Sequence, residues 1–226
     1  IKNATENLLD MPIAATQILF AAIALVKNSQ FNNKKFPRQL VLFDEEFMTE
    51  QNAVVAMTMD IKDLYATKDA NGKLRSRADK VKEAIDFLQN HFFEWVGGKN
   101  SDGRNVEEKL SFIERPKFTS GKLYFETSVF WAEKMINMKI YNPTLFALPK
   151  LLGNTRSVFF SLYLERMEND SWFQWNYENF NKLFSLNFQS ARHLANGFLS
   201  FIKKKLDENS LKSFAYKYSG DYIFIK

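Results

Sequence analysis

The feature that most constrains this chain is a predicted helix over residues 189–204, which has one apolar side and one basic, polar side. At about 100° per residue, its apolar side chains fall in one stripe, which predicts that this side packs on a core. The opposite side contains no carboxylate. The expected buried stripe consists of Ala191, Leu194, Ala195, Phe198, Phe201 and Ile202. The polar side carries Gln189, Ser190, Arg192, His193, Asn196, Ser200, Lys203 and Lys204.

A predicted hairpin follows this helix, and a shorter predicted helix precedes it. Residues 211–225 contain two aromatic and β-branched runs separated by Ser219-Gly220-Asp221, a pattern typical of two antiparallel strands. Residues 172–175 are predicted as a strand, and Asn176 as the N-cap of the shorter helix. A tight turn over residues 185–188 then joins the two helices. The order helix, strand, helix, turn, helix and hairpin is the one expected of a winged helix.

The polar side of the predicted helix has the chemistry that duplex DNA requires. Long cations can contact phosphates, while guanidinium and amide groups can reach base edges in the major groove. The second helix of a helix-turn-helix lies in that groove, and a basic hairpin residue such as Lys217 can contact an adjacent backbone. The alternative is a solvated face on a winged helix that binds protein. Gly197 has two interpretations, a close approach to backbone or phosphate, or plain packing.

The charge distribution agrees with a nucleic-acid partner. The chain has a net charge of +5, and residues 187–226 contain seven basic and three acidic residues. Cysteine is absent, which is compatible with a reducing compartment, and we expect a cytoplasmic protein. The most apolar segment, Ile18–Val26, is much shorter than the roughly 20 residues that span a bilayer. We therefore expect a core helix there and no membrane partner.

The same order of elements is predicted earlier in the chain. A strand over Ala53–Met59 is followed by Asp60 as an N-cap, and a long helix is expected over Arg75–Phe93, ending before a loop at Gly97-Gly98. A hairpin around Thr119-Ser120-Gly121 follows. The predicted fold is therefore α+β, with two tandem winged-helix domains over 1–140 and 141–226 that are mainly helical and carry small antiparallel β-hairpin wings.

The first domain has a different predicted role. Its long helix mixes cations with Asp79, Glu83 and Asp86, and phosphates would repel these carboxylates. We therefore expect backbone contacts without base readout, together with dimerisation. The alternative is a solvated basic loop. The predicted contacts of this domain are Lys73, Arg75, Arg77 and Lys80 near the helix start, and Lys117 and Lys122 on the wing.

This arrangement resembles a known family over nearly the whole chain. The tandem winged helices, the Ser161-Leu162-Tyr163 helix, and the helix-turn-helix from Leu183-Phe184 to Ile202 are similar to those of plasmid replication initiators that bind iterons. The resemblance implies that monomers bind origin repeats and initiate replication, while dimers bind an operator inverted repeat and repress their own synthesis. It also implies contacts with the host initiator and the replicative helicase. The C-terminal domain would make the main base contacts.

Other classes of protein lack support in this sequence. A rolling-circle initiator needs clustered histidines, but His91 and His193 are far apart in the chain, and no phosphate-binding Gly-rich Lys-Ser/Thr loop is present. We expect no catalytic residues, no metal and no cofactor. Two alternatives to a replication initiator stay open: a transcriptional regulator with the same domains, and an interaction scaffold that does not bind DNA.

Overall fold

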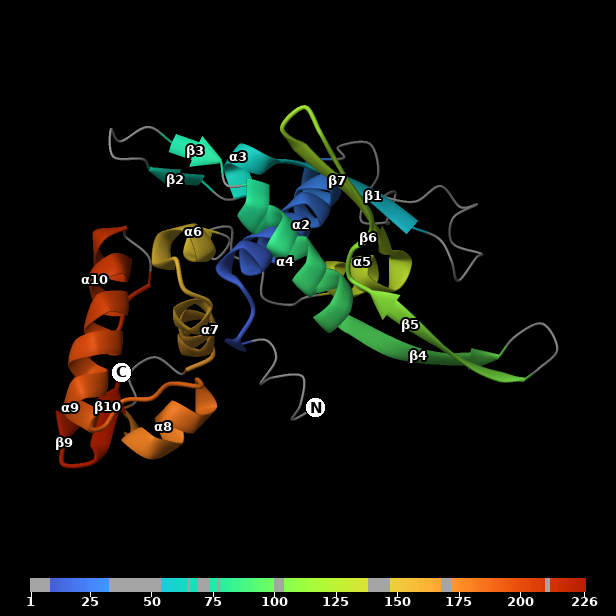
Figure 1. Ribbon diagram of the computed structural model, residues 1–226. Coiled ribbons are helices and arrows are strands. Elements are labelled where there is room, and N and C mark those ends of the chain that lie inside the picture. The colour runs from blue at the N-terminus through green and yellow to red at the C-terminus, as the bar shows by residue number, and fades with distance from the viewer. Residues whose placement is uncertain are drawn as a thin grey trace. The chain divides into compact units, whose positions relative to one another are not determined.

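The computed structural model describes residues 9–32, 54–64, 66–68, 74–76, 78–99, 104–137, 147–167, 172–209 and 212–226. The chain forms two compact units, shown in Figure 1. We call Ile1–Ile13 with Asn142–Lys226 the C-terminal unit, and Ala14–Tyr141 the N-terminal unit. Both combine helices with small antiparallel sheets, which confirms the α+β class.

The C-terminal unit contains one three-stranded sheet with the strand order β8-β10-β9. Its first strand ends where the Asn176 side chain accepts a hydrogen bond from the Glu178 amide, which confirms Asn176 as an N-cap. The hairpin turns at Gly220, whose φ of 54° suits glycine at this place in a two-residue loop. The elements are α6 (Leu148–Leu152), α7 (Thr155–Leu164), β8 (Phe173–Asn176), α8 (Tyr177–Leu183), α9 (Ala191–Leu194), the π turn η3 (Ala195–Leu199), α10 (Ser200–Glu208), β9 (Tyr216–Ser219) and β10 (Tyr222–Ile225).

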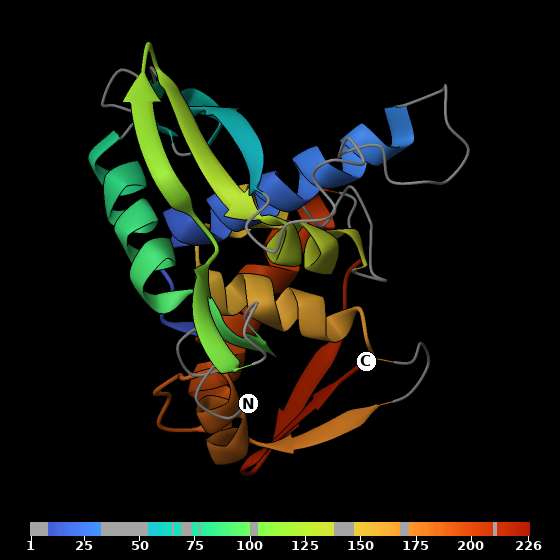
Figure 2. The same cartoon turned by 90° about the vertical axis from the view of Figure 1, so that its right-hand side faces the viewer.

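The core of this unit is built around the ring of Phe160, a residue of α7 that is almost fully buried. Four other phenylalanine rings surround it at centroid distances of 5.4 to 5.6 Å, mostly edge to face. They belong to α8 and its C-cap, η3, and the segment before β9, so one cluster joins helices to sheet. The strands lie along the lower edge of Figure 2. The four rings are Phe180, Phe184, Phe198 and Phe214.

The N-terminal unit contains a three-stranded sheet with the order β1-β7-β6, so its first strand again pairs with the last strand of a hairpin. That hairpin turns at Ser120 and Gly121, with φ values of 48° and 75°, as a type I′ turn requires. The elements are α2 (Ile13–Asn32), β1 (Val54–Asp60), α3 (Ile61–Leu64), β2 (Ala66–Lys68), β3 (Leu74–Ser76), α4 (Ala78–His91), β4 (Phe93–Lys99), β5 (Asn105–Ser111), β6 (Glu114–Thr119), β7 (Lys122–Ser128) and α5 (Val129–Ile136).

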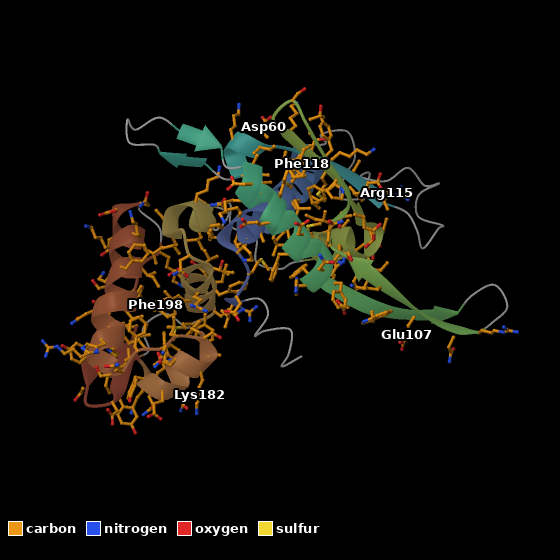
Figure 3. The ribbon with its side chains drawn as sticks, in the orientation of Figure 1. Asp60, Glu107, Arg115, Phe118, Lys182 and Phe198 are labelled. Atoms are coloured by element: carbon orange, nitrogen blue, oxygen red, sulfur yellow. The ribbon has the colours of Figure 1, made fainter. Side chains whose placement is uncertain are left out.

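The predictions for the middle of this unit were partly wrong. Helix α4 begins at Ala78, and Arg75 lies in β3 instead of the helix. Gly97 and Gly98 are not a loop but belong to β4, which pairs with β5 along seven residues. The reason is tertiary pairing: the aromatic and β-branched start of β4 favours a strand, and a long ladder with β5 offsets the glycines' weak preference for strands. Figure 3 shows the β4–β5 hairpin, a two-stranded ribbon that carries Glu107, extending from the rest of this unit.

The short link between β5 and β6 anchors this ribbon to the core. Phe112 is fully buried, and its ring lies edge-on to Phe92 and Trp131. The Trp131 indole also donates a hydrogen bond of 3.1 Å to the Leu110 carbonyl. No helix in these described segments is both long and apolar enough to cross a membrane.

Candidate nucleic-acid interface

The helix that starts at Ala191 is held at its first turn by two side-chain contacts. Ser190 caps it, because its hydroxyl accepts a hydrogen bond of 3.2 Å from the His193 amide. The preceding turn is tied to α8 by Asn181, whose side chain donates to the Phe188 carbonyl at 2.8 Å and accepts from the Phe188 amide at 3.3 Å. Because both backbone groups of Phe188 are bound, the start of the helix is fixed relative to α8.

The middle of the helix contains a π turn that changes which residues are buried. The Ser200 amide donates to the Ala195 carbonyl, five residues earlier. The turn therefore contains one residue more than an α-turn. Every later side chain is rotated about the helix axis relative to its position in a regular α-helix. Leu199 becomes fully buried, whereas Phe201 is 43% exposed, so its predicted place in the buried stripe was wrong. The other five predicted members, Ala191, Leu194, Ala195, Phe198 and Ile202, are buried. Figure 3 shows Phe198 on the α7 side of the helix and Lys182 on α8.

The polar side chains at successive turns of this helix form one exposed surface. Arg192 and His193 lie in the first turn, Asn196 in the π turn and Ser200 at the start of α10, and all are exposed. Gln189 is exposed just before the helix, and Ser190 is half-buried because it caps the helix. We call this surface the helix face, defined as Gln189, Arg192, His193, Asn196 and Ser200. It bears a fixed cation and several hydrogen-bond donors and acceptors.

Gly197 is explained by packing. A Cβ at this position would lie 2.9 Å from Cε1 of Phe188, which is closer than carbon atoms approach without displacement. Of the two interpretations, the packing glycine is therefore correct in this structure, because the Phe188 ring occupies the space beside the helix.

The lysines at the end of the helix are paired with carboxylates. Lys203 contacts Asp207 at 2.8 Å, and Lys204 contacts Glu208 at 3.8 Å. The predicted polar side ended at Lys204, whereas the helix continues to Glu208, and this further turn brings acidic residues alongside the lysines. These pairs are exposed and therefore weak, so phosphates can replace the carboxylates as partners.

Asp207 also links the helix to the segment before β9. It accepts hydrogen bonds from Lys203 and from the hydroxyl of Ser213 in the segment before β9. These bonds, with that from Lys203 the stronger cause, hold the pKa of Asp207 below its ordinary value of 3.8. The carboxylate is therefore charged throughout the physiological pH range.

Lys217 lies on the outer face of the small sheet of the C-terminal unit. Its ammonium group is 4.7 Å from the centroid of the Trp172 ring and 5.5 Å from that of Phe224, so two cation–π contacts orient it. Strand β9 also packs against α9 and the π turn. Lys217 thus belongs to the same unit as the helix face, on a strand that contacts the helix.

The predicted contact residues of the N-terminal unit are dispersed over several of its elements. Lys117 and Lys122 are both exposed and share one face of the β6–β7 hairpin, since they lie opposite Tyr124 and Thr119 in the ladder. Lys80 in α4 pairs with Glu83 at 2.6 Å. Arg75 lies in β3, opposite Thr67. Lys73 and Arg77 lie outside the described residues.

Sequence reasoning missed two residues at the C-terminal site. Asn181 positions the turn, and the available signal was an asparagine near a predicted turn, whose side chain often binds backbone groups. Phe201 is exposed beside polar side chains, and nothing in the helical period indicated this, because the π turn depends on packing.

Among the described residues, no three His, Asp or Glu side chains gather as a metal site would require. No protein-family model matches this chain, and no curated protein matches it.

Proposed function

We propose that this protein binds duplex DNA through the helix face and acts as a plasmid-type replication initiator on repeated sites at an origin. The observation that carries the DNA-binding part is the exposed row of Arg192, His193, Asn196 and Ser200 on the second helix of a turn-linked pair. An α-helix fits the major groove, where arginine pairs with guanine and asparagine with adenine. A helix that presents such groups over successive turns suits this groove.

The surroundings of the helix face support the same proposal. Lys203 and Lys204 lie at its C-terminal end in exposed ion pairs that phosphates can disrupt at little cost. Lys217 is a further exposed cation, on the hairpin of the same unit. On this proposal the lysines hold the backbone, and the helix face reads the bases.

We further propose that both units are winged helices and correspond to the domains expected over 1–140 and 141–226, except that Ile1–Ile13 belongs to the C-terminal unit. The support is the shared element order and the shared pairing of a first strand with the last strand of a hairpin, β1-β7-β6 and β8-β10-β9. The N-terminal domain would contact backbone through Lys117 and Lys122 and mediate dimerisation. The role in initiation, the dimer that binds an operator, and the host initiator and helicase as partners rest on the resemblance to iteron-binding initiators.

Selection of bound duplexes from a random pool at moderate salt tests the DNA-binding proposal. Wild-type protein should enrich a consensus sequence. Arg192→Ala should weaken binding to it by about 1 to 3 kcal/mol and relax specificity at one position, because a bidentate base contact is lost. The matched control is Lys182→Ala, which removes an exposed cation from α8, outside the helix face.

Failure to enrich any sequence would contradict the proposal and leave the interaction scaffold. If the Arg192→Ala/Asn196→Ala double variant kept the wild-type preference for the consensus duplex over random duplex, the helix face would not read bases.

A second measurement separates an initiator from a transcriptional regulator. An initiator should bind an array of direct repeats and increase the reactivity of an adjacent AT-rich segment toward permanganate, which oxidises unpaired thymines. A regulator should bind the same consensus without opening the duplex.

A further inference from the structure

Phe201 is the one large apolar side chain exposed along the helix that carries the helix face. It is 43% exposed, and it lies one turn after Asn196 and one turn before Lys204. Burial of this ring against a partner would recover the apolar transfer free energy that its exposure forfeits.

The exposure of Phe201 follows from the π turn and not from a missing core. Leu199, Ile202 and Leu206 fill the buried side of the helix at this level, and all three are almost fully buried. In a regular α-helix, Phe201 would sit at the flank of the buried stripe. The extra residue in the π turn shifts Phe201 away from that stripe, and its side chain is exposed. π turns of this kind occur often at functional sites.

Resting on the proposed duplex binding, we infer that Phe201 contacts the 5-methyl group of a thymine in the major groove and so selects thymine at one position of the site. Thymine is the only base with an apolar group on its major-groove edge, and phenylalanine is among the side chains that contact it. Arg192 and Asn196 supply hydrogen bonds to other bases, so Phe201 adds a different kind of readout on the same helix.

Deoxyuridine tests this inference, because it lacks only the methyl group and leaves base pairing intact. Each thymine of the selected duplex is replaced singly by deoxyuridine, and the Kd is measured for wild type, Phe201→Ala and Phe201→Leu. In wild type, one replacement should weaken binding about fourfold, the value of one methyl-sized group removed from an apolar contact. In Phe201→Ala the same replacement should have no effect, whereas Phe201→Leu should retain most of the wild-type response.

Three results would overturn the inference. The first is that no deoxyuridine replacement weakens binding by wild type. The second is that the sensitive position is equally sensitive in Phe201→Ala. The third is that Phe201→Ala changes the sedimentation of the free protein but not its affinity for DNA, which would make Phe201 a protein contact. Each is distinct from failure of the proposed function, which would appear earlier as the absence of any enriched duplex.

Discussion

The ring of Phe188 occupies the space in which a side chain at Gly197 would stand, with Cε1 only 2.9 Å from the position of a Cβ. Phe188 cannot retreat freely, because its backbone is bound on both sides by Asn181. The contact therefore joins the turn before the helix to the π turn within it.

Gly197→Ala should lower the free energy of unfolding by about 1 kcal/mol or more, measured by urea denaturation, because crowding by the Phe188 ring outweighs the gain in helix propensity. Asn196→Ala is the matched control and should not destabilise, since its side chain is exposed. In the double variant Phe188→Leu/Gly197→Ala, the loss should be smaller than the sum of the single losses. A stabilised Gly197→Ala variant would refute this explanation of the glycine.

Asn181→Ala should destabilise by about 1 to 3 kcal/mol, because the Phe188 amide and carbonyl lose their partner in a part-buried turn. Lys182→Ala, an exposed neighbour on the same helix, should stay within about 0.5 kcal/mol of wild type. Chemical denaturation of both variants gives the comparison. If the two changes cost the same, Asn181 does not hold the turn.

Ser190 allows helix capping to be separated from DNA binding. Ser190→Asp should keep the stability of wild type, since aspartate is an equally good N-cap, but it should weaken duplex binding because it adds a carboxylate beside the helix face. Ser190→Ala should instead lower stability by about 1 kcal/mol. Thermal unfolding and a duplex titration measure the two effects. Unchanged duplex affinity in Ser190→Asp would argue against this end of the helix facing DNA.

The lowered pKa of Asp207 predicts a loss of stability in acid. Its folded-state pKa lies below the ordinary 3.8, so the ionised carboxylate stabilises the fold at neutral pH. That contribution is complete above the unfolded pKa and disappears as the pH falls from about 4 through the folded value. Asp207→Asn should therefore be less stable than wild type at pH 7 and approach it at low pH. A difference that does not change with pH would exclude this linkage.

Lys203 and Asp207 should have opposite effects on the salt dependence of duplex binding. On the proposed DNA binding, Lys203→Ala would remove a phosphate contact and should reduce the slope of log Kd against log salt by about one. Asp207→Asn releases Lys203 from its ion pair and should strengthen binding at low salt. The same titrations on a random duplex should show both changes, because phosphate contacts carry no sequence information. A Lys203→Ala slope equal to that of wild type would place this lysine outside the interface.

Local rules in the sequence were sufficient for several features. The cap at Asn176, the turns at Ser120-Gly121 and Gly220, and five of the six expected buried residues of the long helix are confirmed. Each depends on neighbours within about four residues, so the information is present in a short stretch of chain. The exposed residues Arg192, His193 and Asn196 also follow from the helical period.

Tertiary structure decided what local patterns left open. The glycines of β4 are in a strand because β5 pairs with them, and Phe201 is exposed because packing favours a π turn that buries Leu199 instead. The amino-acid sequence by itself determined the apolar and polar sides of the helix, the cap of the helix before it and the hairpin after it. Only the folded chain determined the rotation of its second half and the partners of its lysines, since both depend on contacts whose energies exceed the small local preferences of single residues.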